Sequence, residues 1–392
     1  MSRRRRAQPR ERRRRQRPTA REAAAELLAA ELGFRGFRPA LEAEARRAAE
    51  EAERLPLQRR DLTELATFTV DPATARDFDD AVSAQREGDG FRLWIHIADV
   101  AAHVRPGSAL DLEARRRANS TYVPGAVEPM LPLALSSDAC SLAPGVERLA
   151  VTTEIELDPG ARPRSTRFYR SLIRSDARLD YDQLDDVFAG RTPAPEPVAE
   201  PLAAAREVAA ALGEQRAGSE LAVESAEPEF EFDVEGEVTG ARRVEQTESH
   251  RLIERLMILT NEQVAQFLVA RRLPAIYRVH PQPDPPRIER LLEQLAALGI
   301  PTPPLGQGLS PRSAGQLAAE ASRLALREAR HRGHGREAYV SLVLRSLKQA
   351  AYSERNTGHA GLGSEAYAHF TSPIRRYPDL VVHRALLAAI GE

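Results

Sequence analysis

Apolar residues recur at helical spacing in two short segments near the start of the chain, residues 22–32 and 41–55. A breaker with two glycines and a proline, residues 33–39, separates them, so the pattern predicts two helices joined by a short turn. Such a pair is typical of a helix-turn-helix module on nucleic acid, and equally of a plain helical cap on the next domain. The pattern leaves both interpretations open.

From Thr67 the pattern becomes that of a β-sheet, and it returns to helical spacing in the second half of the chain. Alternation that turns at Gly236 predicts a hairpin over 230–238. The mixture of elements predicts an α+β fold. The predicted strands cover 67–70, 91–100, 151–157 and 166–173, and the later helices cover 201–212, 248–268, 286–298, 313–331 and 337–350.

Composition narrows the class of protein. The chain has 392 residues, which is enough to bury a large core, and it contains no apolar run of the length that spans a membrane. Cys140 is its single cysteine, so a disulfide framework is excluded, and the first residues lack the apolar stretch of a signal peptide. We therefore expect a cytoplasmic protein.

The formal net charge of -1 conceals a basic N-terminus. Residues 1–18 hold ten arginines and one glutamate, and they are predicted to form a disordered, arginine-rich tail. Such a tail is attracted to polyanions such as RNA, although a solvated tail without a partner fits the same residues.

Four carboxylates stand within ten residues directly after a predicted strand: Asp71, Asp77, Asp79 and Asp80. If they converge, their mutual repulsion requires cations, and oxygen ligands of this kind are preferred by Mg²⁺ or Mn²⁺. A solvated acidic turn is the plainer alternative. Phe78 between two of the aspartates favours an anchored segment, with Asp77 and Asp79 pointing the same way if it is extended.

A second chemical signal is the segment Thr371-Ser372-Pro373-Ile374-Arg375-Arg376. Thr371 or Ser372 before Pro373 predicts a helix N-cap with proline at the first helical position, where backbone N–H groups receive an anion. Arg375 and Arg376 add phosphate donors to the same turn. An ordinary surface helix start fits as well, but the two signals together indicate phosphoryl transfer on a polyanion.

These segments and several others resemble, in order, the catalytic domain of the ribonuclease II and ribonuclease R family. The resemblance covers residues 58–392. The motifs that carry it are Asp71-Pro-Ala-Thr-Ala-Arg-Asp-Phe-Asp-Asp-Ala-Val, Ile95-His-Ile-Ala-Asp-Val, Tyr122-Val-Pro with Pro129-Met-Leu-Pro, Ser141-Leu-Ala-Pro, Tyr277-Arg-Val-His and His369-Phe-Thr-Ser-Pro-Ile-Arg-Arg-Tyr-Pro-Asp-Leu.

The resemblance implies a processive, hydrolytic 3′→5′ exoribonuclease that releases nucleoside 5′-monophosphates from single-stranded RNA. It places Asp71, Asp77, Asp79 and Asp80 on the four acidic positions that hold two Mg²⁺ ions, for which Mn²⁺ substitutes, with Asp79 most closely tied to catalysis. It gives Arg375 the role of neutralising charge on the scissile phosphate, with Ser372 and Arg376 beside it as RNA-binding residues.

Two tyrosines complete the implied site. Tyr181 matches the aromatic that stacks on the terminal base, and Tyr277 is expected to line the same channel. For each of them, packing at a hydrophobic edge is the alternative.

The chain also departs from the family pattern. We expect residues 1–18 to be the tail, 19–57 a small helical module in place of cold-shock domains, and 58–392 the catalytic domain, with its C-terminal end and a trailing OB-fold domain absent. We expect a monomer. The alternative function is a non-catalytic RNA-binding protein of the same fold, inactive through loss of the C-terminal segment.

Overall fold

The structure is a computed structural model that describes residues 19–33, 36–52, 58–218, 220–222, 227–233, 236–305 and 308–392. The predicted tail and the end of the second predicted helix lie outside these residues. The chain divides into two compact units. The larger comprises residues 36–120, 129–227 and 245–392, and the smaller comprises residues 1–35, 121–128 and 228–244.

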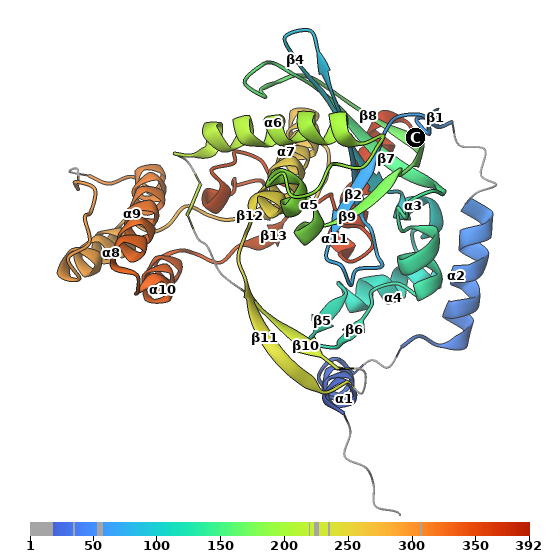
Figure 1. Ribbon diagram of the computed structural model, residues 1–392, viewed down its shortest axis with the longest axis horizontal. Helices are drawn as coiled ribbons and strands as arrows, with labels where there is room; N and C mark the ends of the chain where they lie inside the picture. The colour runs from blue at the N-terminus through green and yellow to red at the C-terminus, as the bar shows by residue number, and fades with distance from the viewer. Residues whose placement is uncertain are drawn as a thin grey trace, which may run out of the picture. The chain divides into compact units, whose positions relative to one another are not determined.

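A seven-stranded mixed sheet is the centre of the larger unit, with the strand order β1-β8-β7-β4-β3-β2-β9 (Figure 1). Its middle strands pair antiparallel, whereas β9 runs parallel to β2 and β1 runs parallel to β8. The strands are β1 (Arg60–Asp61), β2 (Phe68–Asp71), β3 (Asp80–Glu87), β4 (Gly90–Ala98), β7 (Glu147–Leu157), β8 (Pro163–Arg174) and β9 (Ala177–Asp180).

One face of this sheet is covered by α6 (Ala199–Arg216) and α7 (Glu248–Ala270), which pack on β3 and β4 (Figure 1). The side chains of Val82, Leu93 and Ile95 point into this core. α5 (Tyr181–Phe188) packs against α7, and α11 (Tyr377–Ile390) contributes Val382 and Leu386 to the same cluster.

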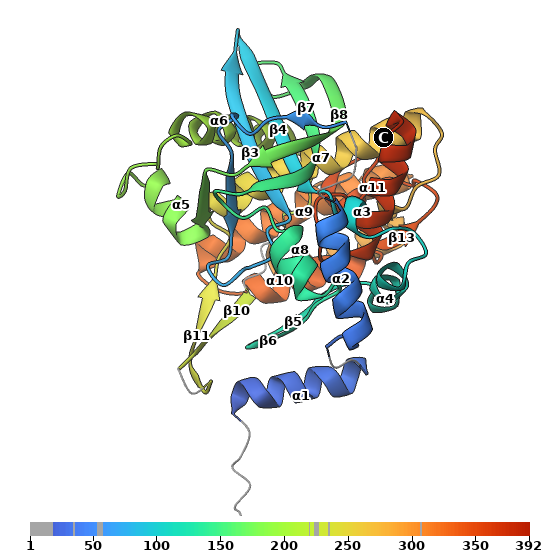
Figure 2. The same cartoon turned by 90° about the vertical axis from the view of Figure 1, so that its right-hand side faces the viewer.

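The other face carries a second core, formed by α2 (Pro39–Ala52), α3 (Val100–His103), α4 (Ala109–Arg117) and a π-helical turn, η1 (Leu135–Ala139). α2 lies alongside α3 in Figure 2 and buries Leu41 and Ala45 in this core. The packing of α2 fits the interpretation as a helical cap.

Three helices build a lobe of the larger unit with a core of its own: α8 (Pro285–Ala297), α9 (Pro311–Arg332) and α10 (Arg336–Ser346). Flanking this lobe in the sequence, β12 (Tyr277–Val279) and β13 (Ala351–Ser353) pair antiparallel, and a 3₁₀ turn, η2 (Ala360–Leu362), follows. The predicted helix 337–350 ends earlier than expected, because Leu347 adopts an extended conformation before β13.

The smaller unit contains α1 (Ala20–Leu32) and two hairpins, β5 (Thr121–Val123) with β6 (Ala126–Glu128) and β10 (Glu227–Phe232) with β11 (Val238–Val244). α1 begins with a capping box between Thr19 and Glu22 and packs on β6. α1 and α2 belong to different units, and the helix-turn-helix interpretation stays a prediction. The α+β class and the predicted hairpin are confirmed.

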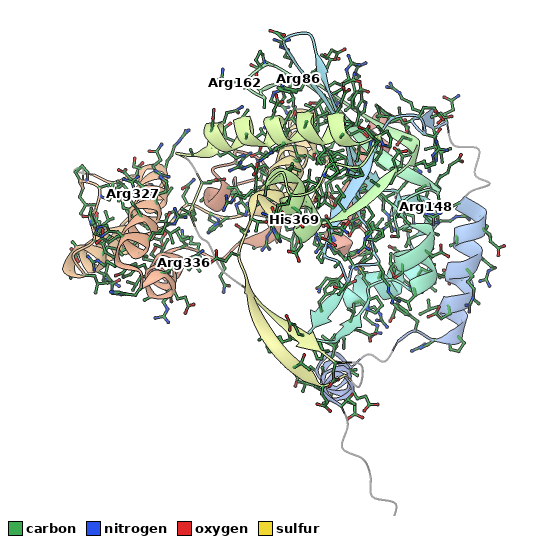
Figure 3. The ribbon with its side chains drawn as sticks, in the orientation of Figure 1. Arg86, Arg148, Arg162, Arg327, Arg336 and His369 are labelled. Carbon is green, nitrogen blue, oxygen red and sulfur yellow. The ribbon has the colours of Figure 1, made fainter. Side chains whose placement is uncertain are left out.

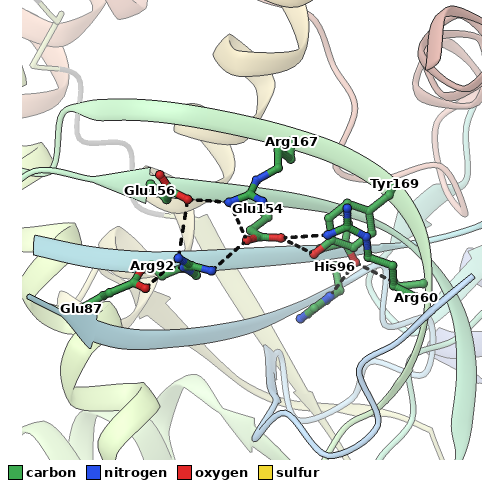
Figure 4. Close-up of polar contacts among 10 residues, drawn as sticks. Arg60, Glu87, Arg92, His96, Glu154, Glu156, Arg167 and Tyr169 are labelled. Atoms are coloured by element: carbon green, nitrogen blue, oxygen red, sulfur yellow. Dashed lines mark hydrogen bonds and ion pairs between the residues drawn. The ribbon is translucent and has the colours of Figure 1, made fainter.

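Glu154 on β7 gives a stability prediction. Its buried carboxylate accepts a hydrogen bond from the Tyr169 hydroxyl (2.7 Å) and lies within 3.5 Å of guanidinium groups of Arg60, Arg92 and Arg167 (Figure 4). We expect Glu154→Gln to lower the free energy of unfolding by about 1–3 kcal/mol, because hydrogen bonds to a buried charged group are lost. Urea denaturation measures this.

Glu156 provides the matched control, since it lies two residues along β7, is 33% exposed and pairs with Arg167 and Arg92. Glu156→Gln should cost less than about 1 kcal/mol, because solvent already screens its ion pairs. Equal losses in both variants would show that the burial of Glu154 adds nothing.

Candidate active site

The sheet brings the first and last predicted carboxylates to one edge. Asp71 ends β2 and Asp80 begins β3, and because these neighbouring strands are antiparallel, both side chains lie at the same end of the sheet. β9 runs parallel to β2 with Asp180 opposite Asp71, so α5 starts at this edge with Tyr181.

The loop between these strands, residues 72–79, is tied down at Phe78. The Phe78 ring is buried, its N–H donates to Ser141 Oγ (3.0 Å), and its carbonyl accepts from the Leu142 N–H. Ser141 Oγ in turn donates to the carbonyl of Arg76 (2.9 Å). The acidic segment is therefore anchored, as Phe78 predicted. The role of Ser141 was missed, although its motif carried part of the resemblance.

Ser141→Ala should therefore disturb the site without touching a carboxylate. It leaves the Phe78 N–H and the Arg76 carbonyl without their partner, which should cost about 1–3 kcal/mol of folding free energy. Displacement of the loop should slow the RNA hydrolysis that the resemblance implies about 10- to 100-fold, because small displacements of reacting groups are costly. Melting temperature and single-turnover cleavage rate measure the two effects.

Ser136→Ala is the control for this variant. Ser136 is equally buried, but its hydroxyl donates only to the Pro132 carbonyl, within the same turn. A cleavage rate that falls as far in this control as in Ser141→Ala would contradict the assigned role.

Asp79 and Arg375, separated by almost three hundred residues, meet at this edge. Asp79 is 3% exposed, and its Oδ1 accepts a hydrogen bond from the Ile374 N–H (2.8 Å). Its Oδ2 lies 3.4 Å from Arg375 Nε. The two chemical signals of the sequence thus form one site, and the Arg375 side chain is 47% exposed beside the buried carboxylate.

The segment around Pro373 differs from its prediction. It is a turn, in which the N–H groups of Arg375 and Arg376 donate to the Ser372 carbonyl, and α11 begins only at Tyr377. The helix start was displaced because Arg376 is extended and forms a bridge with Asn119. The N–H groups of Ser372 and Ile374 donate to Asp379 and Asp79, so the anions that this turn binds are the protein's own carboxylates.

The surroundings of the clustered carboxyl groups disfavour their charged forms. Burial, followed by the charges of Asp80, Asp79 and Asp77, raises the pKa of Asp71, while Arg375 acts in the opposite direction. Burial likewise raises the pKa values of Asp79 and Asp80, again against the effect of Arg375. The carboxylates therefore lack sufficient positive charge from the protein itself.

The donor atoms fit a divalent cation. Asp71 Oδ2 and Asp79 Oδ2 are buried without a hydrogen-bond partner, and the set consists only of carboxylate oxygens, which suits Mg²⁺ or Mn²⁺. Among the described residues, however, no three acidic, histidine or cysteine side chains converge into a complete metal site. The cluster therefore has buried carboxylate oxygens without hydrogen-bond partners, but not a complete set of metal ligands among the described residues.

Two residues predicted to bind phosphate, Ser372 and Arg376, form hydrogen bonds with other residues of the chain. Arg376 donates to Asp379 Oδ1 (2.6 Å), and Asp379 is fully buried at the start of α11. Ser372 is 2% exposed, and its Oγ accepts a hydrogen bond from Arg375 (3.1 Å). Asp379 was not singled out from the sequence, although it stands three residues after Arg376 in the same motif.

The two predicted tyrosines differ in position. Tyr181 lies at the site, since burial and the carboxylates of Asp80 and Asp71 raise its pKa, but one ring face stacks on His250 with centroids 3.9 Å apart. Tyr277 is 4% exposed and belongs to the main core. Its burial favours the packing alternative.

Comparison with known proteins agrees with this geometry. The RNB domain family matches residues 59–392. Ribonuclease R of Escherichia coli (strain K12) is 39% identical over 333 residues, which is 83% of this chain and 40% of that protein. The chain thus spans less than half the length of this relative.

Solved structures show the same similarity. A Mycoplasma genitalium RNase R in complex with ribose-methylated single-stranded RNA superposes with a TM-score of 0.82 at 31% identity, covering 93% of this chain and 56% of that one. Yeast Ssd1, described as a pseudonuclease, superposes with a TM-score of 0.66 at 21% identity, covering 88% of this chain and 41% of that one, which shows the fold alone. The chain, in which the sheet-edge carboxylates meet Arg375, therefore belongs to the RNB domain family, together with ribonuclease R.

Proposed function

We propose that this chain is a processive 3′→5′ exoribonuclease that hydrolyses single-stranded RNA to nucleoside 5′-monophosphates. The meeting of Asp79 with Arg375 at the carboxylate edge carries the proposal. It places acidic oxygens that need cations beside a half-exposed guanidinium that can pair with a phosphate. The relatives named ribonuclease R support the same activity.

In the proposed reaction the aspartates bind metal and Arg375 binds the phosphate. Asp71, Asp77, Asp79 and Asp80 would hold two Mg²⁺ ions, or Mn²⁺, which when bound lower the pKa of an attacking water and stabilise charge on a leaving oxygen. The Ile374 N–H holds Asp79 in place before the reaction. Arg375 donates to a non-bridging oxygen of the scissile phosphate, where a fixed positive charge offsets developing negative charge.

Tyr181, Tyr277 and Ser372 already have partners within the protein. For Tyr181, base stacking requires either its face opposite His250 or displacement of that ring. Ser372 contributes through Arg375, to which its hydroxyl is bonded. Base stacking by Tyr181 and Tyr277, and phosphate binding by Ser372 and Arg376, stay predictions.

A non-catalytic RNA-binding protein is the second candidate. It is favoured by the absence, in the residues that the structure describes, of three converging metal ligands.

No helix in the described part of the chain is long and apolar enough to cross a membrane. A cytoplasmic location and a monomeric state stay predictions.

Metal removal tests the activity. We expect 5′-labelled single-stranded RNA to shorten stepwise from its 3′ end in Mg²⁺, with nucleoside 5′-monophosphates as products. EDTA should stop the reaction, because in the proposed mechanism the cations would lower the pKa of the attacking water. DNA of equal length is the substrate control. Cleavage that survives EDTA contradicts the proposal. Salt-sensitive RNA binding without mononucleotide release, even with Mn²⁺, supports the second candidate.

A further inference from the structure

Arg278 and Tyr352 face each other across the β12–β13 ribbon. They are direct partners in the antiparallel register, and the guanidinium carbon of Arg278 lies 5.0 Å from the centre of the Tyr352 ring. Tyr352 is 42% exposed. A cation over an aromatic face at this distance is attracted to it, so the tyrosine helps to fix the position of the guanidinium.

His369 connects this pair to the active-site turn. The Tyr352 hydroxyl and His369 Nδ1 are hydrogen-bonded at 2.7 Å, and the two rings meet edge to face at 5.5 Å. Burial and the neighbouring charges of Arg376, Arg278 and Arg375 lower the pKa of His369 to about 3. The imidazole of His369 (Figure 3) is therefore neutral at physiological pH, under the influence of three guanidinium charges.

The three arginines differ in their counter-charges. Arg376 pairs with Asp379 at 2.6 Å, and Arg375 lies 3.4 Å from Asp79. Among the described residues, no carboxylate lies within ion-pair distance of Arg278. Its backbone N–H donates to the Tyr367 carbonyl, and its guanidinium group contacts the Tyr352 ring, which carries no negative charge. An anion from outside the chain would supply the counter-charge that Arg278 lacks.

We propose that Arg278, Tyr352 and His369 form a binding subsite for one phosphodiester group of single-stranded RNA, beside the Asp79–Arg375 pair. The proposal rests on the proposed function for the identity of the ligand. Arg278 binds the phosphate, since a guanidinium matches its oxygens with paired donors. Tyr352 is a positioning residue that holds the guanidinium, and His369 holds the hydroxyl of Tyr352.

RNA binding as a function of salt tests the subsite. The full chain is titrated with labelled single-stranded RNA in EDTA, and affinity is followed by fluorescence anisotropy at several salt concentrations. Arg278→Ala should weaken binding about tenfold and reduce the slope of log affinity against log salt by about 0.7, because one phosphate contact to a single strand is lost. Melting temperatures show that each variant is folded.

Arg327→Ala is the matched control, because Arg327 is an exposed arginine on α9, far from Arg278 in the sequence (Figure 3). It removes the same charge and should leave the slope unchanged. An unchanged slope in folded Arg278→Ala, a slope that Arg327→Ala reduces equally, or no RNA binding at all would each overturn the subsite.

The positioning role of Tyr352 has its own readout. Tyr352→Phe keeps the ring beneath the guanidinium but loses the hydrogen bond to His369, so it should weaken RNA binding about two- to threefold, whereas Tyr352→Ala should resemble Arg278→Ala. Combining the two alanine substitutions should add little further loss, because both remove one contact. Additive losses would overturn the positioning role.

The outcome is separable from that of the proposed function. If the parent chain releases no mononucleotides in Mg²⁺ but Arg278→Ala shows the reduced slope, the subsite stands and the nuclease activity fails. If the parent cleaves RNA and the slope of Arg278→Ala equals that of the parent, the activity stands and the subsite fails.

Discussion

Asp79→Asn is expected to slow RNA cleavage about 1,000-fold, which corresponds to about 4 kcal/mol of transition-state stabilisation. The substitution removes a charge that is 3% exposed and in contact with Arg375, and a neutral amide binds a divalent cation more weakly than a carboxylate does. The amide oxygen can still accept the hydrogen bond from the Ile374 N–H, so the turn should keep its position. Chemistry is lost while the fold is retained.

RNA affinity distinguishes this effect from a loss of structure. Asp79→Asn should bind single-stranded RNA within about threefold of the parent, because the phosphate donors remain and one negative charge is removed. Cleavage is measured in single-turnover assays with Mg²⁺, and affinity is measured by anisotropy in EDTA. Asp89→Asn is the control, since Asp89 is exposed on the β3–β4 turn and pairs only with Arg164. A cleavage rate within tenfold of the parent would remove Asp79 from the catalytic set.

Mg²⁺ provides a readout that does not depend on activity. If the orphaned oxygens of Asp71 and Asp79 hold metal, Mg²⁺ should raise the melting temperature of the parent chain, because a ligand that binds only the folded state stabilises it. The shift should be reduced in Asp79→Asn and unchanged in Asp89→Asn. No shift in the parent would contradict metal binding by this cluster.

The parts of the site could be predicted because they are encoded in short, local patterns. Four carboxylates after a strand need positive charge wherever they lie, and Arg375 supplies part of it beside Asp79. The antiparallel pairing of β2 with β3 then brings Asp71 and Asp80 to one edge. Local pattern and elementary electrostatics identified the two segments, and the resemblance to a known family supplied the expectation that they meet.

The details of the turn could not be predicted, because they depend on contacts between distant segments. Serine before proline is typical of a helix start, but the bridge between Asn119 and Arg376 keeps that residue extended and delays α11. The N–H groups expected to receive a phosphate are used by Asp79 and Asp379. Likewise, only the tertiary fold shows that Tyr277 is buried in the core.

Replacing each of two adjacent arginines by alanine should have different effects: Arg375→Ala should lower the catalytic rate, and Arg376→Ala should lower the folding stability. Arg375 is 47% exposed beside the buried Asp79, whereas Arg376 is 25% exposed and donates to the fully buried Asp379. Arg375→Ala should lower kcat about 100- to 1,000-fold, the usual cost of removing a fixed transition-state donor. Arg376→Ala should chiefly lower the free energy of unfolding, by about 3–5 kcal/mol, because it leaves the Asp379 carboxylate buried without its partner.

The comparison is decisive because the two variants remove the same side chain from neighbouring positions. Single-turnover cleavage in Mg²⁺ and urea denaturation are measured on both, and Arg375→Lys is added because an ammonium keeps the charge without the paired donors. Arg375→Lys should recover part of the lost rate. If Arg376→Ala loses rate without stability, or if Arg375→Ala unfolds while its rate per folded molecule is unchanged, the roles are reversed and Arg376 binds the scissile phosphate.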